Sequence, residues 1–396
     1  MEKVIWVREY YNGNEAVAQA VRLARVEVVA AYPITPQSTI VEEIAAQIAR
    51  GQMDAEYIRV ESEHAALAAC YGAAVTGTRV FTATSSQGLA YMFEMLHYVS
   101  GCRIPLVMAV ANRGLAAPWT IWADHQDSIS CRDTGWIQLY VETAQEALDT
   151  CLQAYKIAED PEVLTPVMLC LDGYVLSHTE EIVEVPSQEE VDRFLPPYKP
   201  DLVVDPERPA VFGVGAGPDI YPIFKQAQQA AMERAREVIK RVDAEYGALF
   251  GRRYGGMVDP YCCRDAEVIL VTLGATSGTA REVVDRLRQE GKKVGVLRLR
   301  ALRPFPTEEV RQILKEARAV AVLDRNCSFG YEGAVCTEIK AALLELERPP
   351  AVAGFILGLG GQDIRQTDIE GIFRCCLEGN YGNAAQQVAT TKVYNL

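Results

Sequence analysis

The chain carries, at residues 60–89, the stretch VESEHAALAACYGAAVTGTRVFTATSSQGL. Glu61 and Glu63 lie two positions apart at the end of an apolar run, so on a strand the two carboxylates would share one face. A helix of small residues is expected over 65–77, and a buried strand over 80–84 then ends on a Ser-Ser-Gln-Gly turn. A carboxylate that opens a helix of small residues, where another backbone or ring can approach, suits a cofactor site at a subunit interface.

The context of Glu63 separates a functional interpretation from a structural one. Taken alone, the segment is as well explained by an acidic strand end in solvent. Between an apolar strand and an alanine-rich helix, however, Glu63 would lie near a helix N-terminus, which stabilises an anion. Partial removal from water there would also allow its carboxyl group to hold or share a proton, as a general acid or base must.

Two further segments follow buried strands. Residues 32–36 read YPITP after a strand expected at 28–32, and the two prolines around Thr35 predict a rigid turn. Arg113 follows a strand expected at 106–110, and arginine binds carboxylates through two parallel hydrogen bonds. Ligands of α/β proteins bind at the carboxyl ends of strands, although a stiff turn and an exposed arginine are also explained by structure alone.

Other motifs give weaker signals. Residues 118–136 hold three tryptophans, three aspartates and His125, but no second His or Cys has ligand spacing, so an ordered polar loop is expected rather than a metal site. The glycine-rich segments at 213–217 and 358–363 lack the residues that complete a phosphate-binding loop. The second of them follows an apolar run and is interpreted as a turn at a strand end, near an interface.

Composition limits the class of protein. At 396 residues the chain should form two domains, and 49% apolar residues are ordinary for a globular protein. The net charge of −14 disfavours nucleic acid as a partner, and no apolar run is long enough for a membrane span. The N-terminal residues lack the pattern of a signal peptide, so a cytoplasmic protein is expected. The eleven cysteines form no C-x-x-C pair and are interpreted as small buried hydrophobes in a reducing compartment.

The spacing of apolar runs predicts an α/β protein in which a parallel-sheet domain over 1–180 is followed by a strap and long helix over 181–260 and a second α/β domain over 261–396. A proline-rich strap or linker is expected over 180–206. Asn14 is placed near the N-cap of the first helix, and Thr307 at the cap of a later one. The expected strands are 28–32, 81–84, 106–110, 167–171, 266–271, 293–299 and 319–324, and the expected helices are 14–24, 222–245 and 277–289.

In their order along the chain, these segments resemble the α subunit of the 2-oxoacid:ferredoxin oxidoreductases, most closely the pyruvate:ferredoxin oxidoreductases. The resemblance covers almost the whole chain. It is carried by NGNEA at 12–16, AYPITPQ at 31–37, VESEH at 60–64, FTATSSQGL at 81–89, RDTGW at 132–136, RPFP at 303–306, VLDRN at 322–326 and GLGG at 358–361.

The resemblance implies a thiamine-diphosphate enzyme divided over several chains. This chain would contribute the pyrimidine-facing domain, followed by a domain like the C-terminal domain of transketolase. Glu63 matches the glutamate that faces the aminopyrimidine ring and promotes formation of the thiazolium ylide. Pro33, with Tyr32 beside it, matches the lining of the cofactor site, and Thr35 and Arg113 match residues that hold the substrate carboxylate. No metal ligand is expected in this chain.

The implied partners carry the remaining chemistry. A β subunit would bind the diphosphate and Mg²⁺, and γ and ferredoxin-like δ subunits, or fusions of them, would complete an assembly that holds [4Fe-4S] clusters. The implied reaction converts a 2-oxoacid, expected to be pyruvate, and coenzyme A into acyl-coenzyme A and carbon dioxide while ferredoxin is reduced. The alternatives are a branched-chain or aryl 2-oxoacid enzyme, a transketolase-type enzyme without iron–sulfur chemistry, and a scaffolding subunit. Both Glu63 and Arg113 are present, which disfavours the scaffold.

Two departures concern the substrate. Relatives that decarboxylate oxalate carry arginine where this chain has Thr35, so oxalate is disfavoured. Many pyruvate enzymes carry a Pro-Ile-Asn-Ile type of sequence where this chain has Trp119 and Trp122. The loop with these two tryptophans is therefore expected to limit the size of the substrate side chain.

Overall fold

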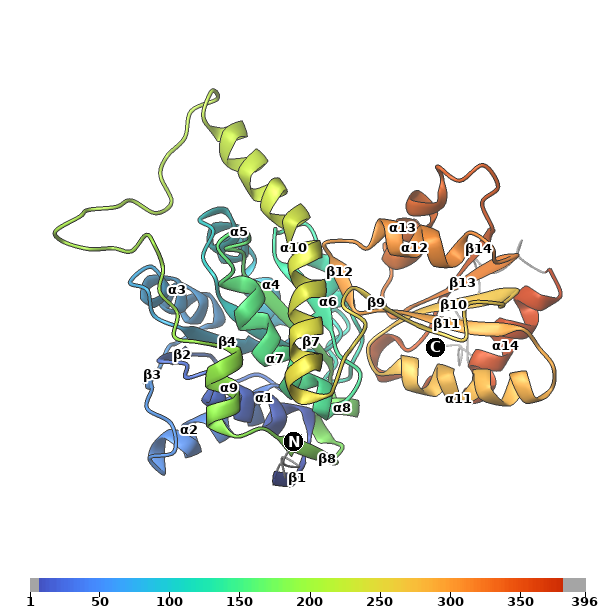
Figure 1. Cartoon of the computed structure of the whole chain (residues 1–396), viewed down its shortest axis with the longest axis horizontal. Helices are drawn as coiled ribbons and strands as arrows, with labels where there is room; N and C mark the ends of the chain where they lie inside the picture. Colours follow the sequence, from blue (N-terminus) through green and yellow to red (C-terminus); the bar gives the residue numbers. More distant parts are fainter. Residues whose placement is uncertain (1–6, 380–396) are drawn as a thin grey trace.

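The computed structural model describes residues 7–379, whose strands form three sheets (Figure 1). The largest sheet has the order β12-β6-β7-β5-β4-β2-β3, and all of its neighbouring strands are parallel except the β12–β6 pair. A five-stranded sheet has the order β14-β13-β10-β11-β9, with β9 antiparallel at one edge. A short ribbon pairs β1 with β8. Two sheets with parallel strands confirm the predicted α/β class.

The strands are β1 (Val7–Tyr11), β2 (Val28–Ala30), β3 (Glu56–Ile58), β4 (Val80–Thr84), β5 (Val107–Asn112), β6 (Ile137–Tyr140), β7 (Val167–Asp172), β8 (Glu181–Val185), β9 (Val258–Tyr261), β10 (Val268–Leu273), β11 (Val294–Leu299), β12 (Ala301–Arg303), β13 (Ala319–Asp324) and β14 (Ala351–Ile356).

The helices of the first part are α1 (Gly13–Leu23), α2 (Ser38–Ala49), α3 (Glu63–Ala74), α4 (Ser86–Tyr91), α5 (Phe93–Gly101), α6 (Gln126–Ser130), α7 (Ala144–Ala158), α8 (Val175–His178), α9 (Gln188–Phe194) and α10 (Tyr221–Phe250). Those of the second part are α11 (Thr276–Gln289), α12 (Thr307–Leu314), α13 (Ala334–Leu343), the 3₁₀ turn η1 (Leu359–Gly361) and α14 (Gln366–Leu377).

Helices cover both faces of the central strands. Every residue of β4, β5, β7, β10 and β13 is buried, which explains why these strands appear as continuous apolar runs. In the smaller sheet, α12 and α13 lie on one face and α11 and α14 on the other (Figure 1). The parallel register pairs Thr84 with Val110 and Asn112 with Asp172, so β4, β5 and β7 end at the same edge of the larger sheet.

Several expected details are wrong at the ends of elements. The N-cap of α1 is Asn12, not Asn14, because the extended backbone of Asn12 lets its side chain accept from the backbone N–H groups of Asn14 and Glu15. The buried Asn14 side chain instead donates to the carbonyl of Pro36. α12 does begin at Thr307, but that residue provides no cap, because Pro306 occupies the N-cap position.

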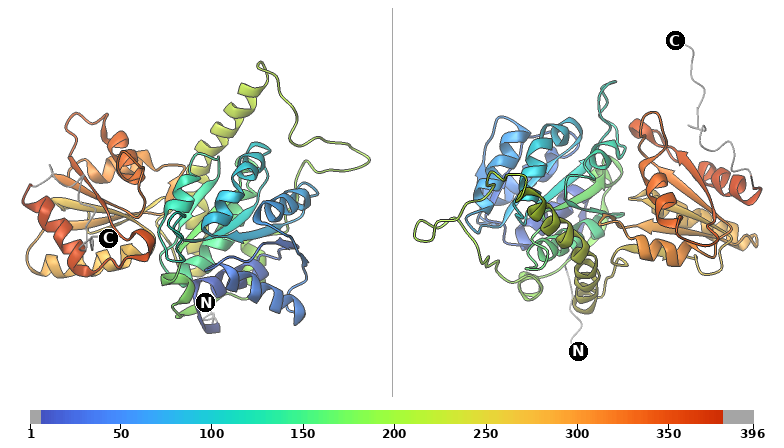
Figure 2. Two further views of the ribbon diagram at one scale, coloured as in Figure 1. Left: turned by 180° about the vertical axis from the view of Figure 1, so that it is seen from behind. Right: turned by 90° about the horizontal axis from the view of Figure 1, so that it is seen from above.

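The segment expected as a strap contains regular structure. β8 pairs with β1, and α9 begins with a capping box in which Ser187 and Glu190 satisfy each other's backbone N–H groups. The chain between α9 and α10 first lies along the body, where the backbone N–H of Val204 donates to the carbonyl of Val75, and then loops away from it before α10 returns (Figures 1 and 2).

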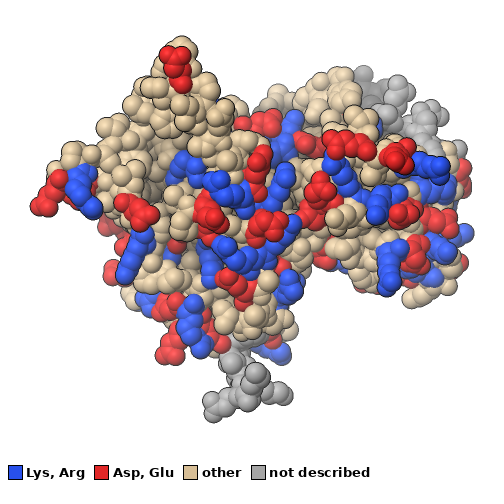
Figure 3. All heavy atoms as spheres, turned by 45° about the horizontal axis from the view of Figure 1, so that its top comes forward, with Lys and Arg blue, Asp and Glu red and all other residues tan. Residues whose placement is uncertain are grey.

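This projection exposes apolar side chains. Val211, Val214, Tyr221, Ile223 and Phe224 are all about half exposed or more. In Figure 3 the charged residues are interspersed over the body, and the projecting part carries both basic and acidic atoms among larger uncharged areas. Exposed apolar surface of this kind is typical of a contact with another protein.

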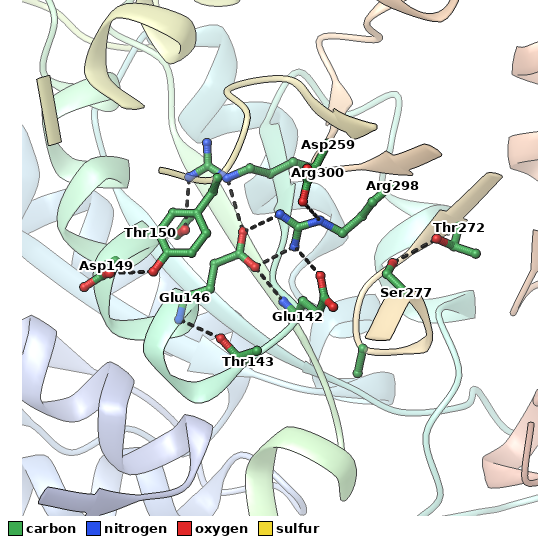
Figure 4. Close-up of polar contacts among 12 residues, drawn as sticks. Glu142, Thr143, Glu146, Asp149, Thr150, Asp259, Thr272, Ser277, Arg298 and Arg300 are labelled. Carbon is green, nitrogen blue, oxygen red and sulfur yellow. Dashed lines mark hydrogen bonds and ion pairs between the residues drawn. The ribbon is translucent and has the colours of Figure 1, made fainter. Parts of the chain in front are cut away.

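The two large sheets are connected through the backbone and through buried charges. Only Arg300 separates β11 of the smaller sheet from β12, which pairs with β6 at the edge of the larger one. Arg298 from β11 donates to both carboxylate oxygens of Glu146 on α7, at 2.5 and 3.0 Å, and all of these side chains are buried (Figure 4). Arg300 lies beside Glu146 and donates to Thr150 and Gln153.

A second junction joins the carboxyl ends of β7 and β13. The buried Asp172 carboxylate accepts from Arg325, from His125 at 2.8 Å and from the backbone N–H of Ala275 at 2.7 Å. Burial alone would raise the pKa of Asp172, but Arg325 and His125 hold it well below its usual value. Gly361 donates its backbone N–H to the carbonyl of Ala123, so the glycine-rich segment is a turn after β14 that contacts the first part of the chain.

No helix within residues 7–379 combines the length and apolarity needed to cross a bilayer. The eleven cysteines all lie in this range and are free thiols, and Cys70, Cys151 and Cys170 are completely buried.

Candidate active site

The predicted site residues lie at the carboxyl edge of the larger sheet. Thr35 follows β2, the Ser85–Ser86 turn follows β4, and Arg113 follows β5. Glu63 comes from the start of α3, which follows β3. Because these parallel strands are neighbours in the sheet, the residues that follow them converge on one region.

Thr35 and Arg113 are in direct contact. The Arg113 guanidinium donates through Nη1 to the carbonyl of Thr35 at 3.0 Å and through Nε to the carbonyl of Thr120 at 2.6 Å. Burial lowers the pKa of Arg113 from its usual value, but an arginine remains charged. Arg113 is only 4% exposed, and its Nη2 has no hydrogen-bond partner among residues 7–379, so this nitrogen can still donate to an anion.

The two tryptophans of the following loop face different surroundings. The Trp119 ring is 72% exposed and its centroid lies 5.4 Å from the Arg113 guanidinium carbon. Trp122 instead packs against Tyr174, with ring centroids 4.4 Å apart, and against Gly361 of the second part. Of the two rings, Trp119 is therefore the one that lies against Arg113.

Glu63 is a buried carboxylate at the first position of α3. Ser62 is the N-cap, and its hydroxyl accepts from the backbone N–H of Ala65. The Glu63 side chain is only 9% exposed, and within the described part of the chain it has no hydrogen bond or ion pair. Glu61 lies in a bend and is exposed, so the expectation that the two carboxylates share one strand face is wrong, because the chain turns into the helix at Ser62.

Gly88 on α4 packs directly against this carboxylate. A Cβ added at Gly88 would lie 2.7 Å from Oε1 of Glu63 and closer still to the hydroxyl of Thr84. The hydroxyls of Thr84 and Ser85 are completely buried and lack hydrogen-bond partners among the described residues. Glycine at this position therefore brings α4 close to the Glu63 carboxylate and two unpaired hydroxyls.

These features fit the aminopyrimidine ring of thiamine diphosphate. The nearly buried Glu63 carboxylate has no partner among the described residues, so it can accept a hydrogen bond from a protonated ring nitrogen. Glu63 is thus the residue that would hold the ring. Pro33 and Tyr32 lie exposed on the turn after β2, and Pro33 lines a surface cavity of about 350 Å³ with α2 and β3. No contact places either of them against Glu63.

Asp127 contacts two of the segments that follow the strands, which no sequence motif indicates. The sequence predicts only an ordered polar loop here, whereas Asp127 lies on the short helix α6. Its carboxylate is 2% exposed and accepts the backbone N–H groups of both Ser86 and Arg113. The signal available in the sequence was an aspartate close behind His125, but spacing alone does not show which strand ends it reaches. Within residues 7–379, no group of three His, Cys, Asp or Glu side chains is arranged to hold a metal ion.

Family models match both parts of the chain. Residues 19–244 match the thiamine-diphosphate-binding domain of pyruvate flavodoxin/ferredoxin oxidoreductases, and residues 266–369 match core domain II of pyruvate:ferredoxin oxidoreductase.

Curated relatives match over nearly their full length. The chain is 51% identical to a pyruvate synthase subunit PorA of Methanothermobacter thermautotrophicus, over 93% of this chain and 95% of that one. It is 48% identical to a ketoisovalerate oxidoreductase subunit VorA of Pyrococcus horikoshii, over 92% and 93%.

Solved structures agree in fold. A 2-oxoglutarate:ferredoxin oxidoreductase from Magnetococcus marinus aligns with a TM-score of 0.71 at 19% identity, covering 94% of this chain and 65% of that one. A split-gene transketolase aligns with a TM-score of 0.55 at 13% identity, covering 93% and 99%. Identities this low support the fold alone. The family matches and the near-complete coverage of the curated relatives lead to one conclusion: the chain belongs to the pyruvate:ferredoxin oxidoreductase family and is an α-type subunit of a 2-oxoacid oxidoreductase.

Proposed function

We propose that this subunit acts in the oxidative decarboxylation of pyruvate, in which pyruvate and coenzyme A give acetyl-coenzyme A and carbon dioxide while two ferredoxins are each reduced by one electron. One observation carries the proposal: Glu63 and Arg113 lie at the same edge of the larger sheet. Among the described residues, the buried Glu63 carboxylate and Nη2 of Arg113 both lack hydrogen-bond partners. The 51% identity to a pyruvate synthase subunit supports pyruvate as the substrate.

Glu63 is assigned the proton chemistry. When bound, thiamine diphosphate supplies the nucleophilic carbon and the electron sink for loss of carbon dioxide. The Glu63 carboxylate would hydrogen-bond the ring nitrogen of its aminopyrimidine and exchange a proton there. Burial under α4 excludes water from one side of the carboxylate, which strengthens that hydrogen bond.

Arg113 and Thr35 are assigned to the substrate carboxylate. Nε and Nη1 of Arg113 are held by the carbonyls of Thr120 and Thr35, so the guanidinium is oriented before substrate arrives. Nη2 would then donate to a carboxylate oxygen, and the exposed Thr35 hydroxyl would add a second hydrogen bond. Trp119, at the Arg113 guanidinium, would limit the size of the substrate side chain.

The remaining components are assigned to partner chains. A β subunit would supply the diphosphate and Mg²⁺ site, and γ and δ subunits or fusions would complete a cytoplasmic assembly with [4Fe-4S] clusters. Support comes from the lack of phosphate-loop and cluster motifs in the sequence and from the apolar projection. We divide the chain at 1–180, 181–260 and 261–396. The thiamine-binding family model spans residues 19–244, so it supports a cofactor-binding unit in the first part of the chain. Glu63 is assigned to face the cofactor there, and Tyr32 and Pro33 are assigned to the lining of its site.

A branched-chain 2-oxoacid is the second candidate substrate. The 48% identity to a ketoisovalerate oxidoreductase subunit is close to the identity with pyruvate synthase subunits, so overall similarity separates the two poorly.

The test is purification of the native complex from its source, with iron analysis and viologen reduction on a panel of 2-oxoacids. We expect a brown, iron-containing complex with its highest kcat/KM on pyruvate. A higher value on 2-oxoisovalerate or an aryl 2-oxoacid would move the substrate to the second candidate. A complex that fails to reduce viologen with any 2-oxoacid of the panel would contradict the proposal.

A further inference from the structure

Asp127 is a buried carboxylate outside the predicted site, and all of its hydrogen bonds are within the protein. Oδ2 accepts the backbone N–H groups of Ser86 at 2.9 Å and of Arg113 at 3.0 Å. Oδ1 accepts from the Asn112 side chain and from the backbone N–H of Ser128, each at 2.8 Å. A single oxygen therefore connects the residues that follow two neighbouring strands, β4 and β5.

The two N–H groups belong to α4, which packs against Glu63, and to Arg113 itself. Ser86 is the first residue of α4 and has a positive φ of 49°, a conformation that a non-glycine residue adopts only when its surroundings fix it. Its hydroxyl lies 2.6 Å from the carbonyl of Gly114, so α4 and the residues after β5 are joined twice. α4 carries Gly88, which lies against the Glu63 carboxylate.

We propose that Asp127 is a positioning residue for the reaction: its carboxylate holds Arg113 at a fixed separation from α4, and hence from Glu63. The inference rests on the roles proposed above for Glu63 and Arg113. The carboxylate of a bound 2-oxoacid and its reacting carbonyl carbon are adjacent atoms. The distance between the residues that hold the substrate and the cofactor therefore decides whether the two reacting atoms meet.

The ionisation of Asp127 provides a specific readout. Burial raises its pKa to about 6, against the hydrogen bonds from Asn112, Arg113 and Ser86 that lower it. Below that pH the carboxyl group gains a proton and loses acceptor capacity, so Arg113 should be held less firmly. Substrate affinity is then expected to be highest above the Asp127 pKa of about 6 and to fall as the pH drops through this value.

The other titratable groups around Asp127 do not change charge in the same pH range. Burial raises the pKa values of Cys131, Tyr140 and Cys170, so these groups stay neutral below pH 8. Arg113 stays charged throughout. Asp124, in the loop just before α6, is a carboxylate whose charge raises the pKa of Asp127, and it accepts from the backbone N–H groups of Gln126 and Gly360.

The experiment measures the Kd of oxamate, an unreactive pyruvate isostere, and kcat/KM for pyruvate between pH 5 and 8 in the complete enzyme. Trp119 fluorescence reports oxamate binding, because this ring lies beside Arg113. For Asp127→Asn, which keeps the shape but has only one acceptor oxygen, we expect roughly tenfold weaker binding, the scale of one charge-assisted hydrogen bond, and no acid limb near pH 6. Asp124→Asn is the matched control: it should keep the affinity above pH 6 and retain an acid limb, moved to lower pH because the Asp124 charge raises the pKa of Asp127.

A second variant separates positioning from folding. Asn112→Ala removes a hydrogen bond that lowers the pKa of Asp127, so it should move the acid limb to higher pH. Wild-type affinity and an unchanged limb in Asp127→Asn would overturn the proposal, and so would an unchanged limb in Asn112→Ala if Asp127→Asn fails to assemble. A wild-type complex that is inactive on every 2-oxoacid would instead contradict the proposed function.

Discussion

Gly88 limits how far Glu63 can move. Its missing side chain leaves just enough room for the Glu63 carboxylate, so Gly88→Ala should displace Glu63 and lower kcat by roughly tenfold or more, as a small misplacement of a reacting group does. Turnover and thermal unfolding of the complex are the measurements. Gly72→Ala, on the same helix as Glu63, is the control. A Cβ there meets no atom within 4 Å, so activity should be unchanged. Full activity in Gly88→Ala would show that this contact does not position Glu63.

A substitution at Arg113 tests its proposed contact with the substrate carboxylate. Arg113→Lys keeps the positive charge but cannot hold the carbonyls of Thr35 and Thr120 while a third nitrogen faces an anion. We expect the Kd for a 2-oxoacid analogue to rise by roughly tenfold, and binding should be measured directly because KM mixes binding with chemistry. An unchanged Kd would mean that another residue holds the carboxylate.

Individual residues were predictable from the sequence to different degrees. Glu63, Thr35 and Arg113 stand directly after apolar runs, and strand ends are visible in a sequence. Asp127 was not predictable as a positioning residue, because its partners lie 41 and 14 residues away and are backbone groups without a sequence signature. Asn12 and Asn14 are both good capping residues, so the choice between them depends on backbone angles that only the structure gives.

At the scale of elements, the packing of β11 against α7 is stabilised by the buried ion pair between Arg298 and Glu146. Arg298→Met would leave Glu146 buried beside Arg300 but without its two strongest hydrogen bonds. The expected cost is about 3–5 kcal/mol in the free energy of unfolding, as for other buried pairs that lose one partner. Urea unfolding followed by circular dichroism measures it. Arg8→Met, which breaks an exposed pair with Glu184, should cost less than ~1 kcal/mol. Equal effects of the two changes would contradict the assigned importance of the buried pair.

Long apolar runs made several elements predictable. β13 was predicted to the residue, and β4, β5, β7 and β11 to within a residue or two, because strands buried on both faces leave a continuous apolar signal. β3 and β6 have only three and four residues, too few for a clear pattern, and were missed. β8 and α9 were hidden in a segment that proline and acidic residues marked as a strap.

At the scale of the whole molecule, the sequence did not predict that β12, which follows a strand of the smaller sheet, joins the edge of the larger sheet. A strand of three residues carries no periodicity, and its pairing with β6 spans more than 160 residues of sequence. The junctions at Glu146 and Asp172 are likewise made by charged residues that sequence patterns assign to the surface.

The division of labour between chains gives a prediction for the isolated subunit. Expressed alone, it should contain no iron and should bind thiamine diphosphate weakly, because the diphosphate and cluster sites are assigned to partners. Metal analysis, visible absorbance and calorimetric titration are the measurements. Stoichiometric iron–sulfur absorbance would show that cysteines of this chain bind a cluster.

The central claim is that Glu63 performs the proton chemistry on the cofactor. The most direct measurement compares 2-oxoacid-dependent viologen reduction in complexes that carry Glu63→Gln or, as the matched control, Glu61→Gln at an exposed carboxylate two residues away. Glutamine preserves size but cannot exchange the proton, so Glu63→Gln should lose roughly two or more orders of magnitude in kcat with normal assembly. Glu61→Gln should keep wild-type turnover. Near-wild-type turnover in a fully assembled Glu63→Gln complex would contradict the account.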